Sequence, residues 1–264
     1  MSASAQARLG ELDRELDQTP VGPQLSGDLF AVVDSLDSSS GLQRALSDPA
    51  APAEAKEGLV NRLYGSRLGQ DALGVVVKAV GLHWHSAREL TDALERQAVR
   101  AELRLAQNSG RLEALNEDLF RFSRTVAGDA PLRDAIENRH APLELRERLV
   151  DQLLTGKVDD GTTRLVKRAL KARERNVALT LESYLEIAAE LANRTIAKVT
   201  AARPLDHEQS QRLRGALDKL AGRPVELQVE VDPSVLGGLR VQIGDQVIEG
   251  TVAGRLEHAR RQIA

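Results

Sequence analysis

The histidines are the first residues of this chain that could do chemistry, because imidazole binds metal ions and transfers protons. His83 and His85 flank Trp84. Side chains two residues apart on a helix point in divergent directions, so the two imidazoles cannot easily share one metal ion. We find no nearby carboxylate at helical ligand spacing. The pattern therefore favours a Trp84 that covers the end of a helical bundle, with a partly exposed histidine on each side.

Two carboxylate pairs, Glu144/Glu147 and Glu226/Glu230, have the residue types that general acid–base catalysis needs. Both pairs fall on faces that we predict to be exposed, and nothing nearby in the sequence indicates a raised pKa. The sequence has no phosphate-binding loop, no dinucleotide fingerprint and no nucleophile elbow, and without cysteine it has no thiol or zinc–thiolate chemistry. We therefore expect a binding or structural protein with no cofactor, and keep a hydrolase that uses Glu144 and Glu147 as a competing hypothesis.

A basic stretch extends from Arg164 to Arg175, with Glu174 as its one acid. A solvated helix face is the plain interpretation, and a surface for an acidic partner is the sharper one. Nucleic acid is disfavoured because the net charge is −3 and aromatic residues make up 2% of the chain. A helical regulatory protein that binds an acidic protein or nucleic acid through Arg164–Arg175 is our alternative function.

The composition indicates which elements must position these residues. Among 264 residues, 42% are hydrophobic and 28% are charged, so a packed core is expected. Ala, Leu, Arg and Glu favour helices, whereas sheet-rich proteins contain more aromatic residues. The charged N-terminus does not resemble a signal peptide, and no apolar run is long enough to span a membrane. We expect a mainly α, soluble protein that reaches any membrane only through a partner.

The helical part contains an internal repeat. Residues 28–63 and 118–153, which are 90 positions apart, are identical at roughly a third of their positions without a gap. The shared residues include Pro52 and Pro142, placed where the first turn of a helix should begin. Apolar residues recur at spacings of three and four in both copies, which predicts short amphipathic helices. A segment from about 86 to 107 closes the first bundle and opens the second.

The hydrophobic period changes near Thr195. The segment 195–205 reads as a strand, Asp206 and Gln209 as a capping box, and 225–231 and 239–243 as alternating strands. A tight turn and a last helix that begins near Thr251 complete a small α/β unit. The predicted fold is α+β multidomain and mainly α, with two tandem small helical bundles (1–92, an apparent duplicate, and 93–194) and a C-terminal α/β domain (195–264).

The C-terminal segment carries an ordered series of motifs: Asp232-Pro233, Gly237-Gly238, the strand Leu239 to Ile243, Gly244-Asp245, Glu249-Gly250-Thr251 and Arg255-Leu256. This series resembles the end of the delta subunit of bacterial F-type ATP synthase, the counterpart of the mitochondrial oligomycin-sensitivity-conferring protein. The region from about Leu94 to 153 is similar to the six-helix bundle of that family. The family's usual Tyr-Ala-x-Ala-Leu start is replaced near Gln97-Ala98, and the extra N-terminal residues resemble extended actinobacterial members.

The resemblance implies a peripheral-stalk protein, a stator subunit at the cytoplasmic face of the cell membrane with no catalysis of its own. It implies that the helical domain grips N-terminal helices of the alpha subunits and that the C-terminal domain joins the end of the b subunit. An amphipathic partner helix in a groove between bundle helices suits the sequence. Position by position, the candidate groove residues are Leu94, Ala98, Ala101, Leu105, Leu165, Val166, Ala169 and Leu170. The candidate contacts to b are Leu239, Val241 and Val247.

Overall fold

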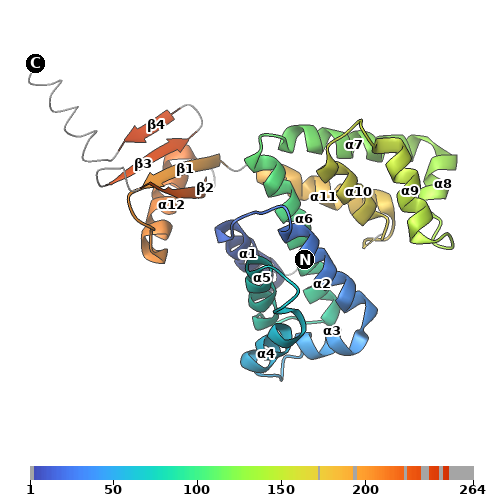
Figure 1. The fold of residues 1–264 in the computed structure, drawn as a ribbon, viewed down its shortest axis with the longest axis horizontal. Helices are drawn as coiled ribbons and strands as arrows, with labels where there is room; N and C mark the ends of the chain where they lie inside the picture. The colour runs from blue at the N-terminus through green and yellow to red at the C-terminus, as the bar shows by residue number, and fades with distance from the viewer. Residues whose placement is uncertain are drawn as a thin grey trace, which may run out of the picture. The chain divides into compact units, whose positions relative to one another are not determined.

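The computed structural model describes residues 3–171, 173–192, 195–222, 225–232, 238–243 and 246–249. The chain divides into two units, Met1–Leu191 and Ala192–Ala264. The first unit is helical, and the second contains a small sheet with one described helix (Figure 1). The expectation of a mainly α chain with a small C-terminal α/β part is thus confirmed in outline.

The helices of the first unit are short, as the spacing of apolar residues predicts, except for one that is 22 residues long. They follow one another along the chain as α1 (Ala3–Gln18), α2 (Leu25–Ser38), α3 (Ser40–Ser47), α4 (Ala53–Tyr64), α5 (Gln70–Gly81), α6 (Ala87–Asn108), α7 (Leu112–Gly128), α8 (Ala130–Glu137), α9 (Leu143–Leu154), α10 (Asp160–Ala169) and α11 (Val177–Ala192).

The helix boundaries repeat at the 90-residue offset. α3 corresponds to α8 and α4 to α9, end residue for end residue, and α2 and α7 end at corresponding positions. The caps repeat as well, since the side chains of Ser39 and Asp129 accept hydrogen bonds from the backbone N–H groups of Leu42 and Leu132 at 3.3 and 3.0 Å. The repeated pattern of short helices that the sequence predicts is therefore present in the structure.

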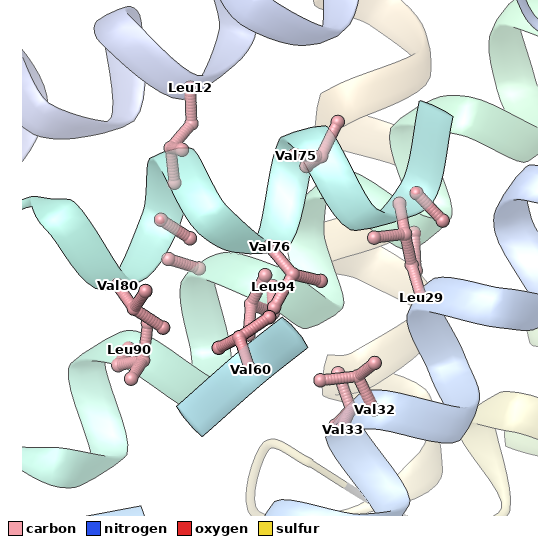
Figure 2. Close-up of a cluster of buried hydrophobic side chains, with 14 of the residues drawn as sticks. Leu12, Leu29, Val32, Val33, Val60, Val75, Val76, Val80, Leu90 and Leu94 are labelled. Carbon is pink, nitrogen blue, oxygen red and sulfur yellow. The ribbon is translucent and has the colours of Figure 1, made fainter. Parts of the chain in front are cut away.

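α6 belongs to both hydrophobic cores of the first unit. Leu90, Leu94 and Ala98 on one face lie in a core with α1 to α5, part of which Figure 2 shows. Val99 and Leu103 lie in a second core with α7 to α11. A helix can serve two cores because residues three or four apart share a face, so two sets can point in different directions. Burying one such leucine contributes roughly 1.5–3 kcal/mol.

The predicted boundary between residues 92 and 93 lies inside α6. The sequence places one helical bundle on each side of this position, and the structure joins both through one continuous helix within a single unit. The residues on either side of the boundary, Asp92 and Ala93, occupy consecutive positions of that helix. The division into bundles 1–92 and 93–194 remains a prediction from the sequence.

The second unit contains β1 (Thr195–Ala201), α12 (His207–Ala221), β2 (Val225–Val231), β3 (Leu239–Ile243) and β4 (Gln246–Glu249). The strands form one sheet in the order β2-β1-β3-β4. β1 is parallel to β2 and antiparallel to β3, and β3 is antiparallel to β4. α12 packs on one face of this sheet, where Leu217 of the helix joins Val199 and Val241 of the strands in a small core.

The local signals that bound α12 act as the sequence predicts. Asp206 and Gln209 form a reciprocal capping box, with the Gln209 N–H donating to Asp206 Oδ1 at 2.7 Å. Gly222 ends the helix with a φ of 67°, a left-handed conformation that glycine adopts without strain. The predicted turn at 244–245, the residues Pro233 and Gly237, and the last helix from Thr251 lie outside the described residues.

Candidate partner-binding surfaces

The cluster around Trp84 is structural. The Trp84 ring is 5% exposed, and its Nε1 donates to the Ala79 carbonyl at 2.8 Å. His83 and His85 are exposed on either side, as predicted. The expectation that no carboxylate stands at helical spacing is wrong, because Glu89 follows His85 by four residues and its Oε2 lies 3.6 Å from His85 Nδ1. Across the part of the chain that the structure describes, no group of three or more potential ligands could hold a metal ion.

Most of the predicted groove residues lie inside the chain's own cores. Leu94, Ala98 and Ala101 are fully buried in the first core, and Leu165, Val166, Ala169 and Leu170 are buried in the second. Leu105 is the exception, since it is half-buried. A fully buried side chain touches no partner unless the helices around it move. These residues therefore determine how α6 and α10 pack, and partner contacts must be sought on exposed positions.

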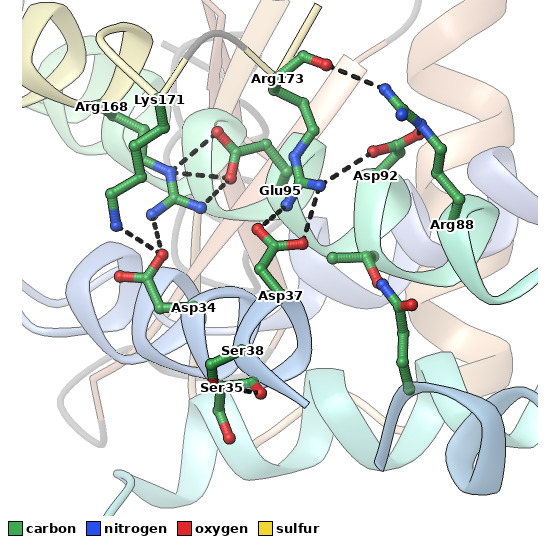
Figure 3. Close-up of polar contacts among 12 residues, drawn as sticks. Asp34, Ser35, Asp37, Ser38, Arg88, Asp92, Glu95, Arg168, Lys171 and Arg173 are labelled. Carbon is green, nitrogen blue, oxygen red and sulfur yellow. Dashed lines mark hydrogen bonds and ion pairs between the residues drawn. The ribbon is translucent and has the colours of Figure 1, made fainter. Parts of the chain in front are cut away.

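The basic stretch is paired with acids of the same chain. On α10, Arg164 binds Glu102 at 2.7 Å and Lys167 binds Asp151 at 2.7 Å. Beyond the end of α10, the side chain of Lys171 reaches Asp34 of α2 and the side chain of Arg173 reaches Asp37 of α2, as Figure 3 shows. The ion pairs to α2 are Lys171–Asp34 at 2.6 Å, Arg168–Asp34 at 2.6 Å and Arg173–Asp37 at 2.6 Å. The basic stretch therefore links α10, whose apolar residues belong to the second core, to α2, whose apolar residues belong to the first core.

Arg168 is at the centre of this junction and is 7% exposed. Its Nε donates to both carboxylate oxygens of Glu95 at 3.0 and 2.8 Å, and its guanidinium lies 4.5 Å from the centre of the Phe30 ring. Burial by itself would lower the pKa of Arg168, but hydrogen bonds and the charges of Glu95 and Asp34 outweigh it and raise the pKa. The guanidinium therefore stays charged inside the junction.

The same contacts shift the pKa values of two neighbouring groups, Asp34 and Tyr184. Burial would raise the pKa of Asp34, yet hydrogen bonds from Lys171 and Arg168 hold it below its usual value. Tyr184 of α11 donates its hydroxyl to Glu95 at 2.7 Å, and burial together with the Glu95 charge raises the pKa of this tyrosine. The junction is thus a set of charge-assisted hydrogen bonds among α2, α6, α10 and α11.

A second group of ion pairs attaches α1 to α6. Arg100 is fully buried and its Nη2 lies 2.7 Å from Asp17. Arg96 contacts Asp13 of α1 at 3.2 Å and Glu190 of α11 at 2.7 Å. Sequence reasoning missed this group, although its signal was present: Arg96 and Arg100 are four residues apart on α6, and Asp13 and Asp17 are four apart on α1.

The candidate residues of the C-terminal unit do not share one environment. Val241 is 4% exposed in the small core, and Leu239 packs against that core while half-buried. In the register, Val241 pairs with Ile248 and Val247 pairs with Gln242, so Val247 is out of phase with the other two. Among the described side chains of this unit, the large apolar ones that are exposed are Leu220, Val229, Val231 and Ile248.

Three large apolar residues are exposed on α7, α9 and α11, and the least exposed of them is Leu179 of α11 at 41%. Phe120 of α7 is 56% exposed and Leu145 of α9 is 52% exposed, although the sequence pattern predicts that Leu145 is buried. Phe120 lies off the α7 stripe formed by Leu112, Leu115, Leu119 and Phe122, which is the sequence signal that it points away from the core. Scattered apolar residues are common on surfaces, but aromatic ones are enriched at interfaces.

The search for membrane spans over the described residues gave no helix with both the length and the apolar character needed to cross a bilayer.

The chain is similar over nearly its whole length to several proteins named ATP synthase subunit delta. The protein from Streptomyces avermitilis is 45% identical and covers 99% of this chain and 96% of its own length. The protein from Thermobifida fusca is 38% identical, with complete coverage of both chains. A chain of the Toxoplasma gondii mitochondrial ATP synthase hexamer covers 64% of this chain and 97% of its own length, at 20% identity and a TM-score of 0.28.

A sequence model of the ATP synthase delta (OSCP) subunit matches residues 94–263. The match begins inside α6 and covers the second core and the C-terminal unit, so it leaves out α1 to α5. The actinobacterial relatives extend across that N-terminal part too, which agrees with the extended form that the sequence motifs indicate. The chain belongs to the ATP synthase delta (OSCP) subunit family.

Proposed function

We propose that this chain is a non-catalytic peripheral-stalk subunit of an F-type ATP synthase. It links the catalytic head to the b subunit and the membrane sector, and it resists rotor torque while proton flow drives ATP synthesis. The observation that carries the proposal is the 45% identity over 99% of the chain with a protein named ATP synthase subunit delta. In this role the chain makes and breaks no covalent bond and needs no cofactor.

A stator must transmit force without bending, and the helical unit has the construction for it. α6 runs through both cores as one 22-residue helix, about 33 Å long at 1.5 Å per residue. Ion pairs hold α1, α10 and α11 to it, and the nearly buried Arg168 of α10 also pairs with Asp34 of α2. Close packing gives protein interiors their low compressibility. This supports a mechanical role for the unit.

We place the contacts of the chain by domain. The family-type helical bundle 93–194 binds the N-terminal helices of alpha subunits, and the C-terminal domain 195–264 binds the end of b. The chain is then peripheral, at the cytoplasmic face of the cell membrane, and reaches the membrane through its partner subunits.

Among the predicted contact residues, Leu105 and Leu239 are half-buried and so can touch a partner without unfolding a core. We add Phe120 and Leu145, which are large, apolar and more than half exposed. Leu94, Ala98, Ala101, Leu165, Val166, Ala169, Leu170 and Val241 contribute by shaping the helices and the sheet beneath, since they are buried.

The alternative function, a regulator that binds through Arg164–Arg175, has lost its main support. Arg164, Lys167, Arg168, Lys171 and Arg173 are each paired with a carboxylate of the same chain. A paired cation offers little attraction to phosphate, because its counter-charge is already beside it.

Recovery of a tagged chain from solubilised membranes tests the proposal. We expect alpha and b subunits to co-purify, and recovery of neither would contradict the proposal. In the same assay, Phe120→Asp should weaken recovery of alpha, because it places a charge in an apolar contact. Ala114→Asp is the matched control, since Ala114 is an exposed residue on another face of the same helix.

A further inference from the structure

A hollow of about 570 Å³ lies where α1, α6 and α11 meet. It is lined by Leu9 of α1, Trp84 of the α5–α6 connection, Asp92 and Arg96 of α6, and Ile187 of α11. The volume lies within the range of about 300–1,000 Å³ that binding pockets occupy. None of the predicted groove residues falls in it, and of the basic stretch Arg164–Arg175 only Arg173 and Glu174 reach it.

The floor of the hollow is apolar and fixed in place. Trp84 and Ile187 are each 5% exposed, and Ala93 is 3% exposed. Trp84 is held by its hydrogen bond to Ala79, and Tyr184 by its hydrogen bond to Glu95. Since these side chains are already locked, a ligand would find the floor preformed and would lose little free energy in ordering it.

The rim carries an excess of negative charge. The lining contains five carboxylates, Glu89, Asp92, Glu95, Glu174 and Glu186, and two guanidiniums. Arg96 and Arg173 are both engaged by acids, at 2.7 Å from Glu190 and 2.6 Å from Asp37. In the part of the chain with described side chains, Glu174 and Glu186 form no ion pair, and both are exposed.

The pKa of Asp92 also indicates that negative charge predominates in the pocket lining. Burial raises the pKa of this carboxyl, and the nearby Glu174 adds to the effect, although Arg173 and Arg88 oppose it. The pKa of Asp92 is raised because the two arginines stabilise its negative charge by less than burial destabilises it. Figure 3 shows Asp92 between Arg88 and Arg173 at this edge of the junction.

A cation with an apolar stem fits this combination. Lysine and arginine side chains bury their methylene stems on apolar surface and keep the charged head near carboxylates. Glu89, Asp92 and Glu95 already pair with Arg8, Arg88 and Arg168, so the uncompensated charge that a ligand would meet is that of Glu174 and Glu186, which repels an anion. Within the described residues the acids do not gather into a group that could hold a metal ion. Such a side chain is best delivered on one face of a helix laid across α1, α6 and α11.

We propose that this hollow, named here the α1–α6–α11 pocket, is a docking site for a basic amphipathic helix of a partner protein, which inserts a Lys or Arg side chain between Trp84 and the carboxylates Glu174 and Glu186. The inference rests on the proposed function in that the partner is a subunit of the same complex. It names the chemistry of the contact, which the family relationship does not give.

Rebinding of the full chain to ATP synthase membranes stripped of it tests the proposal. The double variant Glu174→Lys/Glu186→Lys should bind about tenfold more weakly at low salt, because like charges then face each other, and the deficit should shrink as salt rises. The control Glu113→Lys/Glu182→Lys changes the net charge equally at two exposed glutamates outside the pocket and should bind as the wild type does. Trp84, the one tryptophan of the chain, reports by its fluorescence that each variant is folded.

A crosslink identifies the occupant directly. The chain has no cysteine, so Ser183→Cys in the pocket wall gives a single thiol for a benzophenone label. We expect a crosslink to a partner segment with Lys or Arg at helical spacing. A crosslink to an acidic segment or to a second copy of this chain, or equal rebinding of both double variants, would overturn the inference while leaving the proposed function intact. Failure of the wild-type chain to rebind would overturn both.

Discussion

Phe30 and Phe120 occupy the same position in the two copies of the repeat, 90 residues apart, yet their surroundings differ. Phe30 packs against both cores and lies under the Arg168 guanidinium, whereas Phe120 is 56% exposed. One turn further along, Asp34 of the first copy binds Arg168 and Lys171, and the second copy has Arg124 in its place. The same helix face therefore serves an internal junction in one copy and an outer surface in the other.

The difference shows how one scaffold takes on two tasks. The core positions of the copies are equivalent, since Leu29 and Leu119, like Val60 and Val150, are fully buried. The equivalent buried residues give both copies the same helical fold, and the residues on the other helix faces determine what each copy contacts. If the comparison is right, equivalent substitutions in the two copies should have unequal effects on stability.

Breaking the junction at Arg168 should give the largest effect. Arg168→Ala leaves the buried carboxylate of Glu95 without its charge partner, which should destabilise the chain by about 3 kcal/mol. α5 and α10 also begin 90 positions apart, and at this offset the counterpart of Arg168 is Lys78. The side chain of Lys78 is 41% exposed, so Lys78→Ala should cost less than about 1 kcal/mol. Urea unfolding of both variants checks this, and equal losses would remove the distinction between the copies.

Removal of the two phenylalanine rings should have an intermediate effect. Phe30→Ala takes away a ring that packs against two cores and should lower the free energy of unfolding by about 2 kcal/mol. Phe120→Ala should change the stability of the isolated chain by less than about 0.5 kcal/mol, because its side chain is mostly in water. Thermal unfolding of the two variants measures the difference. A larger loss of stability for Phe120→Ala than for Phe30→Ala would contradict the assignment of Phe30 to an internal junction and Phe120 to the surface.

The smallest expected effect is a dependence on pH. The pKa of Asp34 is lower in the folded chain than its ordinary value of 3.8, so this carboxylate adds stability above that pH and loses it as the pH falls through the folded pKa. Asp34→Asn should therefore cost roughly 0.5 kcal/mol near neutral pH, where the group is 44% exposed, and nothing at strongly acidic pH. Arg124→Gln should show no such change over the acidic range. A pH-independent loss for Asp34→Asn would show that charge does not act there.

The helices and strands could be predicted from the sequence because their signals are local. Pro52 and Pro142 stand immediately before α4 and α9, and the capping box at Asp206 starts α12, all within a few residues of the elements they bound. The alternation of 225–231 predicts β2, but the burial of its apolar face fades from Val225 to the exposed Val231. Burial depends on what covers a strand, which its own alternation does not specify.

The candidate surface was harder to predict because it depends on distant pairings. Leu94 and Ala98 lie on a helix face that the sequence assigns to a partner groove, and the structure uses that face for the first core. The charges of Arg168 and Asp34 are visible in the sequence, but their pairing joins residues 134 positions apart. A periodic apolar pattern shows that a face is covered and does not show by what.

The central claim is that the chain acts as a brace between the head and the membrane sector of the ATP synthase. Proton-driven ATP synthesis in membrane vesicles that lack the chain tests it most directly, with the purified chain then added back. We expect that synthesis is lost while ATP hydrolysis by the head continues, and that the added chain restores synthesis. Synthesis that proceeds undiminished without the chain would contradict it.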